Sequence, residues 1–558
     1  MTASDSTYPS NITKSPQSSK LTQESEASTI VEPSPDDAVT LSGNTTSRPS
    51  SPANKHAIST NTADLEKGST LPTRVEDISK SCNPSESDRG PPDSNSVDWD
   101  GPDDPMNPYN WPTTKKVAIV VGIALITFLT PLGSAMFAPG TAHVMSEFKT
   151  SNPELASFVV SVYLLGYAFG PLIIGPLSEL YGRMYLYHAC NILFIVFNIA
   201  CALAPSLASL IVFRFLAGSA GSCPLTIGAA SLADMIKQEK RGAAMGAWAL
   251  GPLIGPVVGP IAGGYLTEAM GWRWTFWILA IASGAVTINT FLFMSESCHP
   301  ILLERKRKRL VKETGNQNLK SVLDTGKTSK ELFLFAIVRP TKMLFLSPIV
   351  LLLSLFMALV YGYLYLLFTT FTNVFVQQYH FSTGSAGLSF LGIGVGSILG
   401  LAVSATLSDR ILQNLAKKNN GEMKPEYRLP LMIPGGLCVP IGLFWYGWTA
   451  EKGVHYVVPI VGTGFVGVGM IMVFMTGSTY LVDAFTVHAA SAMAATTVLR
   501  SLGGAVLPLC GLKMYSALGL GWGNSLLGFI ALAMTPIPWV FYQYGERVRT
   551  SKRFHVNF

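Results

Sequence analysis

Two arginines placed inside long apolar stretches are the residues of this 558-residue sequence with the clearest capacity for chemistry. Arg214 lies in LIVFRFLAG, residues 210–218, and Arg500 lies in a later apolar stretch. A guanidinium is permanently charged and unfavourable in hydrocarbon, so each should face the protein interior and find partners there. Two structural alternatives remain open: Arg214 could snorkel to the outer surface, and Arg500 could pair with Asp483.

Acidic residues are absent from the middle of the apolar stretches. Glu179, Asp409 and Asp483 are expected near the cytosolic face, and Glu268 is expected near the outer end of its stretch. A proton-coupled transporter usually carries its proton on a buried carboxylate whose pKa changes with access. The sequence therefore identifies no proton carrier.

Several classes of catalytic chemistry lack their motifs in this chain. No GxxxxGK[ST] phosphate loop occurs, and neither HExxH nor GxSxG is present. The seven cysteines are scattered without a CxxC pair, which favours packing over metal or disulfide roles. We therefore expect no enzyme activity, no cofactor and no metal. Any movement of a solute by this protein would be driven by an ion gradient or would simply let the solute equilibrate.

The composition places the chain in a membrane. Hydrophobic residues make up 48% of it and charged residues only 13%, too few charges to cover a soluble protein of this size. The polar segment 1–112 cannot bury enough apolar surface to offset its ordering entropy, and it lacks the features of a signal peptide. It is predicted to be a disordered tail that stays in the cytosol.

Twelve apolar windows of about 20 residues, the length needed to cross roughly 30 Å of hydrocarbon, predict an all-α membrane protein. Six precede a polar central segment and six follow it, at residues 117–137, 156–176, 184–204, 207–229, 243–266, 274–294, 343–367, 385–407, 429–449, 456–480, 490–512 and 522–544. The expected organisation is a six-helix half at 113–294, a central loop at 295–342, a six-helix half at 343–544 and a C-terminal tail at 545–558.

Lysines and arginines in the short connections set the orientation. They are concentrated in the connections that lie on the same side as both termini, and only Lys149, Arg273, Lys452 and Lys513 lie in the opposite ones. Because cytosolic loops are enriched in these residues, both termini and the central loop are predicted to be cytosolic. The sequence ERKRKRL at 304–310 is interpreted as an anchor to anionic lipid headgroups, with a targeting or partner-binding role as the alternative.

A short internal repeat supports duplication of the two halves. GPLSEL at 175–180 follows the second span, and ATLSDR at 405–410 follows the eighth, so that the two LS[ED] segments occupy equivalent places. Repeats of this kind are typical of transporters whose substrate site lies between the halves near the membrane midplane.

The fifth span contains glycine at every fourth position. Gly251, Gly255, Gly259 and Gly263 form one smooth face that lets another helix approach closely. Three prolines in the same span free backbone carbonyls that lipid cannot satisfy. The fifth span is therefore predicted to be buried against a partner helix.

The full pattern in this span resembles the antiporter motif of the major facilitator superfamily, in particular twelve-span drug:proton antiporters of the fungal type. The motif residues are Gly255, Gly259, Pro260, Gly263 and Gly264. GPLSELYGRM at 175–184, LIVFRFLAG at 210–218, DPMNPYNWP at 104–112, GWRWTFW at 271–277 and PEYRL at 425–429 are similar to other segments of this family. The resemblance covers roughly residues 104–544 and implies the major facilitator fold.

The resemblance also implies roles for charged residues. Arg214 would border a central cavity and assist proton coupling, and Arg500 is a second candidate for that role. A cytosolic latch would form in the outward-facing state from Gly175, Glu179, Gly182, Arg183, Asp409 and Arg410. Glu179 and Arg183 have the spacing of an ion pair on a helix. The sequence departs from the family pattern at Glu179 and Leu180, which weakens the first latch, and Asp234 with Arg241 is expected to be similar scaffolding.

Aromatic residues at helical spacing predict a substrate pocket. They lie in the second and seventh spans, which border the cavity in this fold, at Tyr163, Tyr167, Tyr361, Tyr365 and Phe368. Packing or interfacial roles are the alternative. An aromatic cavity would suit a bulky lipophilic compound better than a sugar or a metal ion.

These patterns lead to one main hypothesis and two alternatives. The chain is expected to be a monomeric exporter in the cell membrane, which moves small lipophilic compounds such as drugs, toxins or a self-made secondary metabolite by proton antiport. Its partners would be this substrate, protons and membrane lipid, and no nucleic acid. The alternatives are an uncoupled facilitator or importer of a small organic solute, and a membrane sensor that signals through its tail without transport.

Overall fold

The computed structural model describes residues 95–237, 241–323 and 329–550. The expected disordered tail up to residue 94 and the expected cytosolic end beyond residue 550 therefore lie outside the described residues. The described residues are almost entirely helical.

The first half begins where the apolar sequence begins. Pro112 precedes its first helix, and Gly182, with φ 99°, separates the second span from the third. Its elements are α2 (Thr113–Ala135), η3 (Ala138–Gly140), α3 (Thr141–Glu147), α4 (Pro153–Tyr181), α5 (Arg183–Ala202), α6 (Leu207–Gly221), α7 (Cys223–Met235), α8 (Arg241–Met270) and α9 (Arg273–Phe293).

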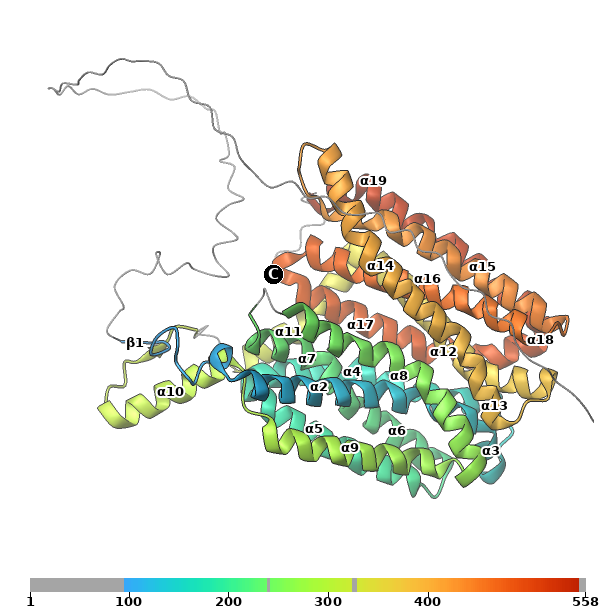
Figure 1. The fold of residues 1–558 in the computed structure, drawn as a ribbon, viewed down its shortest axis with the longest axis horizontal. Coiled ribbons are helices and arrows are strands. Elements are labelled where there is room, and N and C mark those ends of the chain that lie inside the picture. Colours follow the sequence, from blue (N-terminus) through green and yellow to red (C-terminus); the bar gives the residue numbers. More distant parts are fainter. Residues whose placement is uncertain (1–94, 238–240, 324–328, 551–558) are drawn as a thin grey trace, which may run out of the picture. The chain divides into compact units, whose positions relative to one another are not determined.

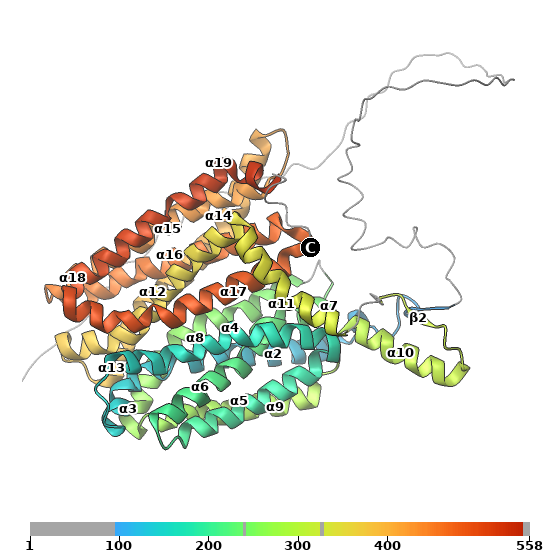
Figure 2. The same ribbon diagram turned by 180° about the vertical axis from the view of Figure 1, so that it is seen from behind.

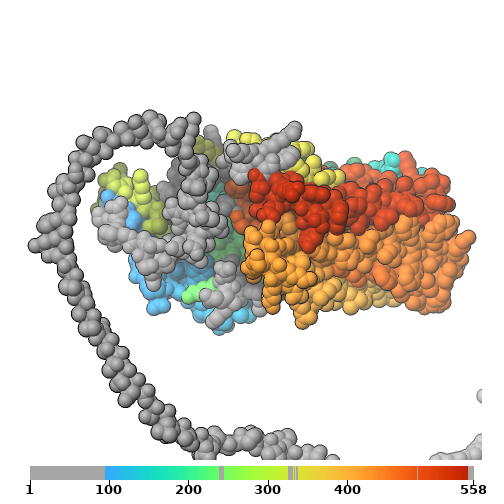
Figure 3. All heavy atoms as spheres, turned by 90° about the horizontal axis from the view of Figure 1, so that it is seen from above, coloured from blue at the N-terminus to red at the C-terminus, as the bar shows by residue number. Residues whose placement is uncertain are grey.

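The second half repeats this arrangement, and Figure 1 shows its yellow to red helices grouped beside the blue to green helices of the first half. Its elements are α12 (Pro348–Tyr379), α13 (Thr383–Gly387), η5 (Leu388–Phe390), α14 (Leu391–Lys418), η6 (Pro425–Leu431), α15 (Met432–Glu451), α16 (Val457–Ala484), η7 (Thr486–His488), α17 (Ala489–Val506), α18 (Pro508–Met534) and α19 (Pro536–Thr550). In the space-filling view from above, the orange and red atoms of this half form one continuous block (Figure 3).

The number of membrane spans depends on a single glycine. Among the described residues, 11 helical stretches are long and apolar enough to cross a bilayer, and the last, Ala489–Thr550, contains 62 residues. An unbroken helix of that length would extend roughly 90 Å, about three times the hydrocarbon thickness. Gly519 interrupts it with φ 77° and ψ 174°, and Figure 2 shows the chain reversing at α18. The stretch thus contains two spans, which gives the twelve that the sequence predicts.

Large apolar side chains cover the outside of the helices. Ile281, Ile288 and Leu292 share one face of α9 and are among the exposed hydrophobic residues, as are Phe169 and Phe529. A soluble protein rarely exposes such a continuous apolar surface, whereas a bilayer solvates it. The exposed face of the helices is therefore the surface that contacts lipid.

The central connection is more ordered than its polar composition predicts. It contains α10 (His299–Thr314), the short strand β2 (Lys320–Ser321) and α11 (Ser329–Leu346). The final part of the supposed disordered tail is ordered as well: β1 (Ser96–Val97) pairs in parallel with β2, and η2 (Pro108–Asn110) precedes α2. Composition indicates disorder for 95–112, but this segment gains contacts from α10, which lies some 200 residues away in the sequence (Figure 1).

Candidate functional site

Arg214 projects from α6 into the protein, where only 1% of the residue is exposed. Its Nη2 atom donates to the backbone carbonyls of Ser134 and Val160, each at 3.3 Å. The guanidinium carbon lies 4.6 Å from the ring centre of Phe137 and 5.5 Å from that of Tyr163. The snorkelling alternative is therefore wrong, because carbonyl oxygens and aromatic faces hold this charge inside the first half.

The partner of Arg214 also connects the two halves. The hydroxyl of Ser134 on α2 lies 2.9 Å from the hydroxyl of Tyr365 on α12. A second bond crosses the interface where Ser161 on α4 donates to the carbonyl of Ala505 on α17 at 2.9 Å. Arg214 is thus separated from the second half by a single residue.

The five predicted pocket residues meet in one hydrophobic cluster, to which both halves contribute. The ring centres of Tyr163 and Tyr167 are 5.2 Å apart, those of Tyr361 and Tyr365 are 5.1 Å apart, and Phe368 lies 5.2 Å from Tyr365. The hydroxyl of Tyr167 is buried there without a hydrogen-bond partner. The structure places these side chains in one cluster, and their role as a substrate pocket stays a prediction.

Arg500 lies on α17 beside this cluster. Its guanidinium carbon is 4.6 Å from the ring centre of Tyr361 and 4.8 Å from that of Phe474 on α16. Its Nε atom is buried and has no hydrogen-bond partner. The suggested pairing with Asp483 is wrong, since Asp483 accepts a hydrogen bond from Arg428 instead.

The glycine face of α8 packs against α2, as the spacing predicts. A Cβ atom at Gly251 would lie 2.8 Å from the backbone nitrogen of Phe128, and one at Gly259 would lie 3.0 Å from the carbonyl oxygen of Leu132. Gly263 is still closer to the backbone of α2. Helix α8 runs through Pro252, Pro256 and Pro260 without a break.

The next motif glycine faces the opposite direction, toward the second half. A Cβ at Gly264 would lie 2.8 Å from the carbonyl oxygen of Thr383 in α13, and Pro260 approaches Gly387 similarly. The antiporter-motif residues therefore divide between two partners, with Gly255, Gly259 and Gly263 on α2 and Gly264 on the other half. Sequence spacing cannot reveal this division, because GxxxG records only that some helix comes close.

On the side predicted to be cytosolic, the expected ion pair of Glu179 with Arg183 does not form. Gly182 ends α4 with a left-handed backbone and lets α5 begin at Arg183, so the two residues do not share a helix. Arg183 instead donates to the carboxylate of Asp234 at 3.3 Å and to the hydroxyl of Ser178. The expected pairing of Asp234 involved Arg241, whose side chain lies outside the described residues.

Glu296 completes this network, although it was not among the predicted site residues. Its carboxylate is buried and accepts hydrogen bonds from the backbone nitrogens of Arg183 at 2.9 Å, Met184 at 3.3 Å and Cys298 at 3.0 Å. The first two are free N–H groups of the first turn of α5, where a negative charge is favourable. No local sequence signal marks this role, because Glu296 lies more than 110 residues from the helix it caps.

The second half contains a matching network around Arg428. Its Nη1 donates to Ser408 and to Asp409, both at 3.1 Å, and its Nε donates to Asp483. Ser178 and Ser408 hold the same position in the internal repeat, so the repeat was a usable signal for this pair of networks. Gly175 lies half-buried in α4 and Arg410 is exposed on α14, and the latch role of both stays a prediction.

A clasp, formed by residues 95–111, contacts α10 and the end of α7 beside the network of the first half. Lys306 on α10 is 3% exposed and donates to the carbonyl of Asp98 at 2.8 Å, and it pairs with the carboxylates of Asp100 and Asp104 at 2.6 and 3.7 Å. Burial alone would raise the pKa of Asp104, but two backbone N–H donors and Lys306 hold that pKa below its usual value. Lys306 was expected to anchor lipid headgroups, and that interpretation is wrong for this residue.

His299 joins the clasp to the helices. Its ring lies 4.9 Å from that of Tyr109 and 5.7 Å from that of Trp99, and its Nε2 atom lies 2.8 Å from the carbonyl oxygen of Asp234. Tyr109 also donates to the carbonyl of Ala233 at 3.3 Å. The segment DPMNPYNWP thus connects α10 to the C-terminal end of α7.

At the opposite ends of the helices, which are predicted to face outward, charged residues join the two halves directly. Glu268 on α8 accepts from the backbone nitrogen of Gly384 at 2.7 Å and from the hydroxyl of Ser382 at 3.0 Å. Glu154 on α4 pairs with Lys513 on α18. These bonds join the halves at the predicted outer side, whereas the ion networks of Arg183 and Arg428 at the predicted cytosolic side each remain within one half.

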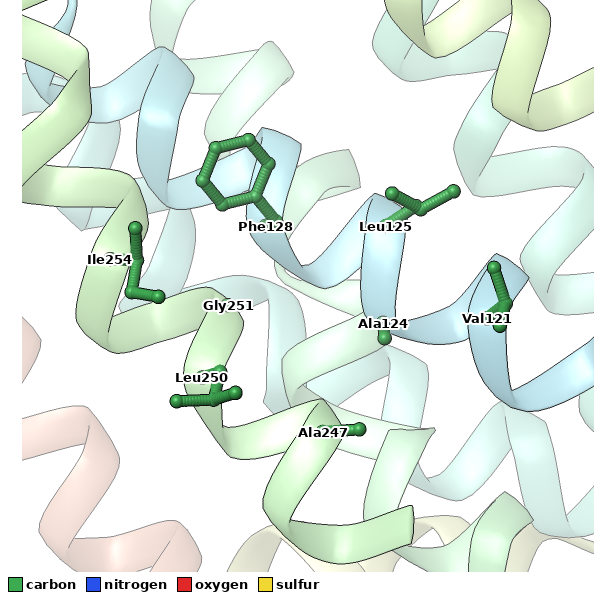
Figure 4. Close-up of a pocket in the computed structure, with 8 residues that line it drawn as sticks. All are labelled: Val121, Ala124, Leu125, Phe128, Ala247, Leu250, Gly251 and Ile254. Carbon is green, nitrogen blue, oxygen red and sulfur yellow. The ribbon is translucent and has the colours of Figure 1, made fainter. Parts of the chain in front are cut away.

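A metal site and an apolar surface pocket are the alternative candidate sites, and neither is supported in the described part of the chain. Within the described residues, no group of three His, Cys, Asp or Glu side chains is placed to hold a metal ion. A pocket of about 290 Å³ lies between α2 and α8 and is lined only by apolar residues, as Figure 4 shows: Val121, Ala124, Leu125, Phe128, Ala247, Leu250, Gly251 and Ile254. It offers no polar group to orient a solute, and several of its side chains belong to the lipid-facing surface.

Comparisons with known proteins agree with this architecture. The family model described as Major Facilitator Superfamily matches residues 123–508. The MFS-type transporter penM of Penicillium rubens is 66% identical over 466 residues, which cover 84% of this chain and 92% of that protein. The efflux pump radE of Floropilus chiversii is 50% identical over 499 residues, 89% of this chain and 92% of the relative. Among solved structures, the xylose transporter XylE of E. coli, in a partially occluded inward open conformation, matches 77% of this chain and 98% of its own with TM-score 0.58 and 16% identity, a likeness of fold alone.

Proposed function

Because this chain belongs to the major facilitator superfamily and is a multi-pass membrane transporter, we propose that it exports small lipophilic organic compounds by alternating access coupled to proton antiport. In this proposal the two six-helix halves rock around a substrate site between them. The protein would act as a monomer in the cell membrane with both termini in the cytosol.

One observation carries the proposal: a buried guanidinium lies next to the aromatic interface between the halves. Arg214 bonds to the carbonyl of Ser134, whose hydroxyl bonds to Tyr365 of the other half. Movement of one half against the other must therefore alter the surroundings of this charge. A solute bound among the tyrosines would lie close to these residues and would also alter the surroundings of the Arg214 charge.

The contacts between the halves support an inward-facing state. Glu268 and Glu154 bridge the halves at the outer face, and Arg183 and Arg428 have their partners within their own halves at the cytosolic face. A latch that joins the halves through Asp409 and Arg410 would form when the cytosolic side closes. Gly264, packed on α13, would be part of the contact that opens when the outer side separates.

The direction of transport is inferred from relatives. One relative, 50% identical, is named an efflux pump, and the antiporter motif of α8 is complete. Compounds of the drug, toxin or secondary-metabolite type match an apolar, aromatic site better than sugars do.

An uncoupled facilitator is the second candidate, and a specific observation favours it. In the described helices, the acidic residues lie near the ends, as with Glu154, Asp234, Glu268 and Asp483, or beyond the apolar stretch, as with Asp409. None of these is placed in the middle of a span, where a proton carrier would be expected.

The test is counterflow in proteoliposomes containing the full chain, with an imposed pH gradient and a panel of lipophilic amines, azoles and polyketide-like dyes. Proton antiport predicts flux that collapses with a protonophore. Flux that ignores the gradient would select the facilitator, and absence of flux for every compound would contradict transport of this class.

Arg214→Ala should remove gradient-driven flux while the protein still reaches the membrane. Arg309→Ala removes the same charge from α10, where Arg309 is exposed and pairs with Glu313, and it should leave flux unchanged. Normal flux in Arg214→Ala would contradict the coupling role of Arg214.

A further inference from the structure

Arg500 lies near the middle of the eleventh predicted span, residues 490–512. It lies eleven residues from the start of α17 at Ala489, which corresponds to roughly 16 Å along the helix axis, about half of the hydrocarbon thickness. Gly504, one turn further on, faces Leu164 of the first half and Tyr361 of the second. Arg500 therefore lies one turn on the cytosolic side of the contact between the halves, the side on which their ion networks are separate.

The charge of Arg500 is only partly compensated. The rings of Tyr361 and Phe474 flank the guanidinium, and its Nε–H is buried without an acceptor. The Nε of Arg214 is likewise buried without an acceptor, but its Nη2 donates to two carbonyl oxygens. Among the described residues Arg500 has no such acceptor, so it keeps more donor capacity for a ligand than Arg214 does.

Three acidic residues near the ends of the described helices already have cationic partners. In the described part of the chain, no ion pair joins Arg500 to a carboxylate. Asp483 bonds to Arg428, Asp234 to Arg183, and Glu154 to Lys513. The middle of the protein therefore contains two guanidiniums without an opposing negative charge, an arrangement that strongly favours binding of an anion.

We propose that the transported solutes are amphipathic organic anions, each a carboxylate or acidic phenol on an apolar body, whose negative group binds Arg500. This inference rests on the proposed export function and narrows its substrate class. A guanidinium binds a carboxylate through parallel N–H donors, and the pair is strengthened where water is scarce. The apolar body would lie against the tyrosine cluster, where the unpartnered hydroxyl of Tyr167 offers a further donor.

The charge preference is tested by binding to the full chain purified in detergent. Two sets of probes share an apolar body and differ in charge: 1-pyrenebutyrate, 1-pyrenebutanol and 1-pyrenebutylamine, and naphthalene-1-acetate with naphthalene-1-ethanol. Equilibrium dialysis measures each affinity, with protein-free micelles as the blank. Each acid should bind at least about ten-fold more tightly than its alcohol, as a charge-assisted hydrogen bond implies, and the amine should bind most weakly.

Variants of Arg500 test whether this residue causes the preference for the acids over the alcohols. Arg500→Gln should reduce the ratio of acid to alcohol affinity to about two-fold or less, and Arg500→Lys, which retains the charge, should keep most of it. Arg309→Gln, with the same loss of charge on α10, should leave the ratio unchanged.

The result on the unmodified protein decides the inference even if Arg500→Gln fails to fold. Equal binding of acid and alcohol, tighter binding of the amine, or no binding of either acid would overturn it. An unchanged ratio in a folded Arg500→Gln would overturn the role of Arg500. Counterflow that moves neutral compounds as well as acids would leave the export proposal standing and remove only this inference.

Discussion

The ion networks around Arg183 and Arg428 contain the same three groups in different surroundings. In the first half, Arg183 joins Ser178 and Asp234, and in the second half Arg428 joins Ser408 and Asp483. The arginine follows its serine by 5 residues in one half and by 20 in the other. The matching geometry therefore arises from how the helix ends pack, and the sequence spacing of the charges does not determine it.

The surroundings of the networks differ in burial. The side chains of Arg183 and Asp234 are 12% and 20% exposed, whereas those of Arg428 and Asp483 are 17% and 37% exposed and that of Asp409, the further partner of Arg428, is 69% exposed. The first network is covered by α10 and the clasp and is completed by Glu296. An ion pair contributes little in water, but removal of one partner is costly in a buried site. The first network should therefore stabilise its half, and the second is free to exchange partners during transport.

The largest expected effect comes from Glu296→Ala. It leaves three backbone N–H groups without their acceptor in a buried position, which should lower the free energy of unfolding by about 3 kcal/mol. Glu426→Ala is the matched control in the second half, since Glu426 is also buried but, among the described residues, accepts only from Arg549, at 3.3 Å. Thermal unfolding in detergent measures both, and an equal loss would contradict the contrast between the halves.

A smaller difference should separate Arg183→Gln from Arg428→Gln. The first leaves Asp234 mostly buried beside Glu296 without a positive partner, at a cost of about 2 kcal/mol. The second leaves Asp409 and Asp483 in contact with water and should cost less than about 1 kcal/mol. A greater loss for Arg428→Gln in the same assay would show that burial is not what distinguishes the networks.

Lys306→Met should release the clasp without unfolding the helices. It removes the ammonium that holds Asp98, Asp100 and Asp104, and local opening should become easier by about 1.5 kcal/mol. Hydrogen exchange of residues 95–111 would increase about ten-fold. Lys308→Met, on the exposed side of α10, is the control and should not change it. Protection that persists in Lys306→Met would contradict the role of Lys306.

The smallest effect is a dependence of the clasp on pH. The folded pKa of Asp104 lies below its unfolded value, so its stabilising contribution is complete above that unfolded value, about 4, and is lost as the pH falls through the folded pKa. Exchange of residues 95–111, corrected for intrinsic rates, should increase modestly below about pH 4. Asp104→Asn should show faster exchange at pH 7 and lose this acid dependence. An unchanged pH profile in that variant would show that a group other than Asp104 causes the acid dependence.

The features that depend on neighbours in the sequence were predictable. Apolar windows predict the spans because bilayer thickness sets their length, and the four-residue spacing of Gly251 to Gly263 predicts a closely packed face on α8. Burial of Arg214 follows from the cost of a charge in lipid. The partner of Arg183 was not predictable in this way, since Asp234 is 51 residues distant and Gly182 removes the helical spacing to Glu179.

Local sequence patterns were sufficient to establish the membrane environment, the twelve spans, the duplicated halves and the family, because hydrophobic length and short motifs act over neighbouring residues. Packing between distant helices was needed to establish that Glu296 caps α5 and that Lys306 is buried by the clasp instead of facing lipid. It was also needed to establish that Asp483 bonds to Arg428 and not to Arg500. Charges in a low-dielectric interior bond to whichever group packing brings within about 3 Å, and that choice depends on the positions of helix ends far apart in the chain.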